Sequence, residues 1–259
     1  MSLILSQVDA LREIDQVWPG VGVVIIGATA LGFYFDMRWR QTSDVDLVVA
    51  LELDDLSDLE RRSGWIRHRR REHEFVAPGG AKVDVLPVGK QSPSAGHIEW
   101  GNGDVMDLAG MDLAFRYAVE HAVLDGYRVR VAPPAVIVLL KMVSFGDRPA
   151  ERERDLEDIA HRLDAYVQED SERRWDEAFD CGEFELAPAY LLGIDVARLC
   201  ASDVHDGVVN RFLLQVGDPQ TSTHALMSSC GPGRWRTEKD ALARRLGAFQ
   251  SAMTRAANT

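Results

Sequence analysis

Two stretches decide the fold of this chain: VIIGATAL at residues 24–31 and RQTSDVDLVV at residues 40–49. The first begins with β-branched residues, then has a glycine and then helix-forming residues, which is typical of a buried strand that turns sharply into a helix. On a strand, side chains alternate between faces, so Asp44 and Asp46 share one face while the apolar residues between and after them point into the core. The sequence therefore predicts strand, glycine turn and helix, followed by a second strand that carries two neighbouring acids.

A third acid, Asp84, lies in the apolar stretch KVDVL at residues 82–86, which we expect to be a strand beside the one that carries Asp46. Three converging carboxylates repel one another unless a positive charge lies between them. Hard oxygen ligands of this kind favour Mg²⁺ or Mn²⁺. We therefore predict that Asp44, Asp46 and Asp84 are metal ligands and catalytic residues, with room for two ions roughly 4 Å apart.

The turn after the first strand supplies the other half of this hypothesis. A strand that ends in glycine and opens a helix presents free backbone N–H groups to a phosphate, so Gly27, Ala28 and Thr29 are candidate nucleotide-binding residues.

The alternative for the acids is a solvated strand edge, because a lone Asp-x-Asp is common in acidic proteins. The order of glycine turn, paired acids and later acid favours the metal site.

Bulk properties limit the class of protein. The chain has 259 residues, is 46% hydrophobic and has a formal net charge of −12, which argues against broad, nonspecific coating of nucleic acid. Its three widely spaced cysteines suggest no disulfide framework, and we expect reduced thiols in a cytoplasmic protein. No targeting segment is visible, and the apolar runs are too short to span a membrane.

The predicted elements divide the chain into a mixed α/β part, residues 1–132, and an all-helical part, residues 133–259. The prolines at 133 and 134 separate the two parts. Within the first part, residues 74–88 predict a hairpin across Pro78-Gly79-Gly80, and the Gly-, Ser- and Pro-rich segment 90–104 predicts a loop.

The order of these motifs resembles the DNA polymerase β-type nucleotidyltransferase superfamily. Within it, the chain is most similar to the AbiEii-like toxin nucleotidyltransferases, which pair Gly-Gly-Thr-Ala-Leu with a Thr-x-Asp-x-Asp strand. The resemblance covers residues 25–86 well, covers residues 141–159 loosely and does not extend beyond Tyr166. Ala28 departs from the pattern, because the family usually has Gly or Ser there. Alanine lacks the serine hydroxyl and some backbone freedom, so its phosphate contacts are expected to be weaker.

The resemblance implies an α/β nucleotidyltransferase core with a mixed sheet flanked by helices, followed by a helical domain. It implies transfer of a nucleoside monophosphate from an NTP to an acceptor hydroxyl, with release of pyrophosphate. It also implies a tRNA end or another cellular target as acceptor and a cognate antitoxin as partner. A small-molecule acceptor, as in antibiotic nucleotidyltransferases, and a protein hydroxyl stay open. So does a noncatalytic nucleotide- or partner-binding protein of the same fold, which Ala28 alone favours.

Two charged positions follow the predicted sheet. Lys141 lies in an otherwise apolar helix, and lysine is seldom buried without a partner, so it must reach a carboxylate, a cleft or a ligand. In the related families a lysine here contacts the triphosphate, and an Asp-x-x-Asp follows it. Lys141 and Asp155 are therefore candidate nucleotide-binding residues, with Asp158 second. The alternatives are a simple salt bridge for Lys141 and a solvated charged face with an Asp158–Arg162 pair.

One dense basic run, RHRRR at residues 67–71, directly precedes the strand with the third acid, and Arg61 and Arg62 add to it. A nucleic acid or a triphosphate would be drawn to such a run. Most short basic runs are solvated loops or hairpins, and that alternative also stays open.

Overall fold

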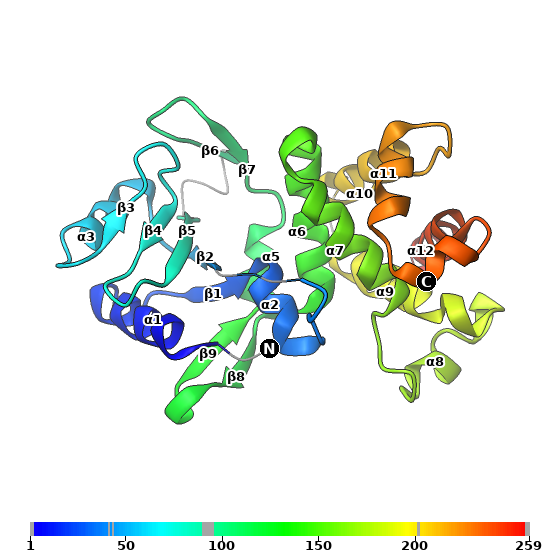
Figure 1. The fold of residues 1–259 in the computed structure, drawn as a ribbon, viewed down its shortest axis with the longest axis horizontal. Helices are drawn as coiled ribbons and strands as arrows, with labels where there is room; N and C mark the ends of the chain where they lie inside the picture. The colour runs from blue at the N-terminus through cyan, green and yellow to red at the C-terminus, as the bar shows by residue number, and fades with distance from the viewer. Residues whose placement is uncertain (1–2, 41, 43, 90–95, 201–202, 257–259) are drawn as a thin grey trace. The chain divides into compact units, whose positions relative to one another are not determined.

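The structure is a computed structural model that describes residues 3–40, 42, 44–89, 96–200 and 203–256. The chain forms two compact units, Met1–Ile137 and Val138–Thr259. Every described strand belongs to the first unit, and the second unit is helical (Figure 1). The boundary between the units lies inside helix α6 (Pro134–Asp147). We keep residues 1–132 and 133–259 as our proposal for the functional domains.

The first unit is built around one mixed sheet. Its elements in chain order are α1 (Leu5–Val17), β1 (Val23–Ile26), α2 (Gly27–Tyr34), β2 (Asp44–Val49), the 3-10 helix η1 (Leu53–Leu56), α3 (Ser57–Glu60), β3 (Ile66–Arg67), β4 (Glu74–Val76), β5 (Lys82–Pro87), β6 (His97–Glu99), β7 (Val105–Asp107), α5 (Met111–Tyr117), β8 (Val119–Ala122), η2 (Leu124–Gly126) and β9 (Arg128–Val131). The sheet order is β3-β4-β5-β2-β1-β9-β8, and β6 pairs with β7 in a separate hairpin. Strand β2 runs antiparallel to β1 and parallel to β5.

Strand β1 lies inside the sheet because its side chains are apolar on both faces. Val24, Ile25 and Ile26 are all buried, and helices α2 and α5 pack against the strand. Burial on both faces is what a continuous β-branched run favours. The predicted order of strand, glycine turn, helix and acid-bearing strand is confirmed, as is the predicted hairpin of β4 and β5.

One prediction in this unit is wrong. The segment 90–104 was expected to be a loop, but His97–Glu99 forms strand β6, which pairs with β7 through Ile98 and Met106. Both of these side chains are buried. A three-residue strand is too short to show a two-residue period above the surrounding Gly, Ser and Pro, so only its partner strand reveals it. Residues 90–95 lie outside the described residues.

The second unit consists of the rest of α6 and a set of helices. They are η3 (Pro149–Glu151), α7 (Glu153–Asp164), α8 (Arg173–Asp176), η4 (Phe179–Cys181), η5 (Phe184–Leu186), α9 (Ala187–Leu199), α10 (Asp203–Val216), α11 (Ser222–Cys230), η6 (Gly233–Thr237) and α12 (Ala241–Ala256). Helices α9 and α12 approach closely at Gly193, where a Cβ atom would lie 2.4 Å from the carbonyl oxygen of Phe249. Glycine therefore sets the spacing of this helix pair.

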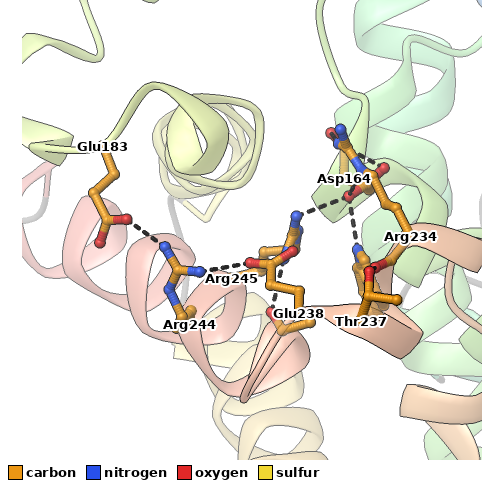
Figure 2. A network of polar contacts seen from close by, with 9 residues as sticks. Asp164, Glu183, Arg234, Thr237, Glu238, Arg244 and Arg245 are labelled. Carbon is orange, nitrogen blue, oxygen red and sulfur yellow. Dashed lines mark hydrogen bonds and ion pairs between the residues drawn. The ribbon is translucent and has the colours of Figure 1, made fainter.

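A buried arginine ties α12 to the other helices of this unit (Figure 2). The Arg245 side chain is 1% exposed and forms ion pairs with Asp164 at 3.1 Å and with Glu238 at 2.9 Å. Its guanidinium also lies 5.0 Å from the centre of the Trp235 ring, and the Trp235 indole N–H donates to Asp164 at 2.7 Å. Because each charge in this network has an opposite charge or a donor beside it, the burial is tolerated.

Among the described residues, no helix combines the length and the apolar character needed to cross a membrane.

Candidate active site

Asp44, Asp46 and Asp84 come together in the middle of the sheet. Strands β2 and β5 are parallel neighbours, and Asp46 is the direct partner of Asp84 in their register. Along β2 the two aspartates alternate with the fully buried Val45 and Leu47, so both acids lie on the same face. One carboxylate oxygen of each of the three acids lies within 4.8 Å of the others. The sequence pattern and the strand pairing together place three acids at one point.

The electrostatics of this cluster show that it is short of positive charge. The pKa of Asp84 is raised to about 8, first by burial and then by repulsion from Asp46, Glu74 and Asp44. Arg71 lowers it, but by less. The acids therefore fit a divalent cation, which would supply the missing charge and would find only hard oxygen ligands at Asp44, Asp46 and Asp84.

Gly27 shapes the turn beside this cluster. It ends β1 with a positive φ of 67° and begins helix α2. A Cβ atom at Gly27 would lie only 2.0 Å from Oδ2 of Asp46, because Ile26 is the register partner of Asp46. Glycine is therefore required twice, for the left-handed backbone and for the space that the Asp46 carboxylate occupies. The free N–H groups at the start of α2 lie directly beside the acids.

Two threonines hold Asp44. The hydroxyl of Thr29, which is 2% exposed, donates to the backbone carbonyl of Asp44 at 2.6 Å. The Thr42 hydroxyl donates to the Asp44 carboxylate at 2.7 Å. The Thr29 hydroxyl is thus used to join α2 to β2. Of the nucleotide contacts predicted for Thr29, we therefore expect the one made by its backbone N–H. Thr42 was not predicted, although its place two residues before Asp44 puts both side chains on one face when the strand continues.

A second group of potential metal ligands shares Asp84. His73, Glu74 and Asp84 also have ligand atoms within 4.8 Å of one another. Glu74 is the register partner of Asp84 across β4 and β5, and its carboxylate forms an ion pair with Arg71 at 2.6 Å. Sequence reasoning predicted this hairpin but missed Glu74. Counting back from the turn at Pro78-Gly79-Gly80 would have placed it opposite Asp84.

Lys141 and Asp155 lie in the second unit and contact each other. The Lys141 ammonium is 2.7 Å from Asp155 and 2.7 Å from Asp158. All three side chains are buried, and so is Arg162. The alternative of a solvated charged face is therefore wrong for α7, because the tertiary packing of α6 covers it. Lys141 has the carboxylate partners that a buried lysine needs, and two carboxylates share its one charge.

The sequence was compared with known protein families. The model of the family described as "Nucleotidyl transferase AbiEii toxin, Type IV TA system" matches residues 10–189, which is more than half of the chain. The chain belongs to this family. Membership makes it an AbiEii-type nucleotidyltransferase and places it among toxin–antitoxin proteins. The match includes the acid cluster, Lys141 and Asp155, and it ends at the start of α9.

Comparison with curated proteins finds no match. Among solved structures, this AbiEii-family chain is similar to an antigenic nucleotidyltransferase-like protein from Paracoccidioides brasiliensis, with 14% identity, a TM-score of 0.42 and coverage of 86% of this chain and 90% of that one. It is also similar to the CdnE cyclic dinucleotide synthase of Elizabethkingia meningoseptica, solved with GTP and Apcpp. There the identity is 11%, the TM-score 0.28 and the coverage 97% of this chain and 92% of that one.

Proposed function

We propose that this AbiEii-family protein transfers a nucleoside monophosphate from an NTP to an acceptor hydroxyl and releases pyrophosphate. The observation that carries the proposal is the convergence of Asp44, Asp46 and Asp84 on two neighbouring strands, with carboxylate oxygens within 4.8 Å of one another. Transfer of a phosphoryl-type group needs charge stabilisation and alignment rather than a covalent intermediate. An acid cluster beside a phosphate-binding turn can meet both needs.

In this proposal Asp44, Asp46 and Asp84 hold Mg²⁺ or Mn²⁺. A bound divalent cation supplies the positive charge that stabilises the developing charge on the transferred group. Asp44 is kept in place by Thr42 and Thr29. Asp84 lies opposite Asp46 in this cluster, and in this proposal its carboxylate accepts the proton of the acceptor hydroxyl.

The nucleotide is held by backbone and side-chain groups. The N–H groups of Gly27, Ala28 and Thr29 bind the β- and γ-phosphates at the start of α2. We further propose Lys141 and Asp155 as nucleotide-binding residues, with Asp155 positioning the Lys141 ammonium. In this proposal the acceptor is a cellular macromolecule such as a tRNA, and the protein acts in the cytoplasm. A cognate antitoxin is the expected partner of a toxin of this family.

The test is a screen with labelled NTPs and Mg²⁺ over total tRNA, protein and small molecules. Asp46→Asn should abolish label transfer to whichever acceptor the wild type uses, because it removes one ligand charge while keeping the shape of the side chain. Asp54→Asn is the matched control, since Asp54 is an exposed acid of η1 away from β2. Transfer by Asp46→Asn at the wild-type rate would refute the site. If only small molecules became labelled, the acceptor would be a small molecule and not a macromolecule.

A further inference from the structure

Large aromatic side chains lie exposed on the segment between α7 and α9. Trp175 of α8 is 64% exposed, Phe179 of η4 is 79% exposed and Phe184 of η5 is 40% exposed. We call residues 169–185 the acidic–aromatic segment. Aromatic rings leave a large apolar area in water, and exposed patches of such area mark surfaces that bind another molecule. The segment therefore has the features of an interaction surface, and the proposed transfer does not use it.

Two of these rings are held in place by their neighbours. The ring centres of Trp175 and Phe184 lie 5.0 Å apart, with an angle of 33° between the ring planes. The Arg174 guanidinium lies 4.7 Å from the centre of the Phe184 ring. Arg174 is itself buried, and its guanidinium donates to the carbonyl oxygen of Val167 at 3.3 Å. Because rings held in this way lose little freedom when a partner binds, more of the contact energy appears as affinity.

The backbone of the acidic–aromatic segment is anchored on helix α9. The Arg173 guanidinium forms ion pairs with Asp195 of α9 at 2.8 Å and with Glu177 at 2.6 Å. Ala178 is buried within the segment, and Leu186 is buried directly after it. Both arginines of the segment are thus engaged in contacts within the second unit.

The segment is strongly acidic. It contains eight acids and only two arginines. Seven of the acids are exposed, namely Glu169, Asp170, Glu172, Asp176, Asp180, Glu183 and Glu185. Asp180 pairs with Arg255, and Glu183 pairs with Arg244 (Figure 2). The other five exposed acids have no ion-pair partner among the residues that the structure describes. Unpaired negative charge therefore precedes, separates and follows the exposed rings along the chain.

The charge of the segment disfavours two classes of partner. Nucleic acid and anionic lipid both carry phosphate charges, which the unpaired acids repel. A molecule that covers the rings must instead bring positive charge. Guanidinium and ammonium groups also bind the faces of Trp and Phe rings. Charge complementarity therefore selects a basic partner.

We propose that the acidic–aromatic segment binds a basic protein segment in which arginine or lysine side chains alternate with apolar ones. The apolar side chains of the partner cover Trp175, Phe179 and Phe184, and its cations meet the acids around these rings. None of the residues involved belongs to the acid cluster, so this binding does not depend on the proposed nucleotidyl transfer.

The test measures binding of short fluorescent peptides to the full chain by fluorescence anisotropy. The first peptide alternates arginine and leucine, the second has glutamate in place of arginine, and the third has serine in place of leucine. The first peptide should bind, more weakly as salt rises, and the second should not bind. The third should bind at least about tenfold more weakly than the first, because it has no apolar side chains to cover the rings.

The aromatic contribution is tested with one pair of variants. Phe179→Ser should weaken binding of the first peptide at least about tenfold, because it removes a ring from the centre of the surface. Leu214→Ser is the matched control, since Leu214 of α10 is also 79% exposed and lies outside the acidic–aromatic segment. Both variants should keep the Tm of the wild type, because both side chains are mostly in solvent.

The acidic contribution is tested with a second pair. Asp176→Asn with Glu185→Gln removes the acids next to Trp175 and Phe184, and should weaken binding about threefold and lower its salt dependence. Asp54→Asn with Glu99→Gln is the matched control. Asp54 and Glu99 are exposed acids of the first unit without an ion-pair partner among the described residues, and their replacement changes the net charge equally.

Failure of the first peptide to bind the wild type, or equal binding of the first and second peptides, would overturn the proposal. Equal losses within either pair of variants would also overturn it, because general apolar exposure or net charge would then explain binding. Sedimentation and binding to phosphatidylglycerol vesicles are measured in parallel. Self-association or vesicle binding that Phe179→Ser removes would show that the surface serves a second copy or a membrane, and would likewise overturn the proposal.

Discussion

Substitution of Gly27 by alanine tests the link between the glycine turn and the acid cluster. The new Cβ atom would lie 2.0 Å from Oδ2 of Asp46 and 2.7 Å from its Cγ, whereas ordinary contacts begin at 3.4 Å. The Asp46 carboxylate or the turn must therefore move by about 1.4 Å. A displacement of about 1 Å in a catalytic group lowers rates by about 100-fold, so we expect at least that loss of label transfer in Gly27→Ala.

Backbone strain at position 27 lowers stability separately from the clash with Asp46, and a control variant measures its effect. A side chain at a positive φ costs about 1–2 kcal/mol, which corresponds to a fall in Tm of about 2–8 °C for a chain of this size. Gly80→Ala is the matched control, because Gly80 has a φ of 80° and no atom within 4 Å of the position of a new Cβ atom. It should lose stability by a similar amount and keep its activity.

The assay is transfer of labelled nucleotide to the acceptor that the wild type uses, together with Tm by circular dichroism. Near wild-type activity in Gly27→Ala would show that the Asp46 carboxylate does not need its position beside the turn. A loss of activity in Gly80→Ala as large as that in Gly27→Ala would show that strain, and not the carboxylate clash, is responsible.

Two further predictions concern charge. Because the pKa of Asp84 is raised to about 8, the metal-free folded state binds more protons than the unfolded chain between about pH 4 and pH 8, so stability should fall as pH rises through that window. Asp84→Asn should remove this dependence and raise the metal-free Tm at pH 8 by at least about 4 °C; an unchanged pH profile would contradict the assignment. Lys141→Met leaves Asp155 and Asp158 buried without their cation and should cost about 3–5 kcal/mol in urea unfolding. Adding Asp155→Asn and Asp158→Asn should restore much of that loss, and a single variant as stable as the wild type would contradict the buried pairing.

Local patterns in the sequence predicted the parts of the fold that neighbouring residues decide. The apolar run before Gly27 and the alternation around Asp44 and Asp46 depend only on residues a few positions apart, and these elements are confirmed. The segment with β6 was missed, because a three-residue strand has no period of its own and exists through its pairing with β7.

Family resemblance extended the prediction to an AbiEii-type nucleotidyltransferase, which the family match confirms. It did not supply the contacts around the site. The hydrogen bond from Thr42 to Asp44 and the carboxylate partners of Lys141 were identified only from the folded structure.

The sequence by itself determined which residues carry charge and which face of each strand they occupy, because side-chain direction follows from the two-residue period of the strand. Tertiary structure alone decided that Asp84 is opposite Asp46. Pairing between strands more than 30 residues apart depends on the packing of the whole sheet, and a register shift of one residue would turn these acids to the other face.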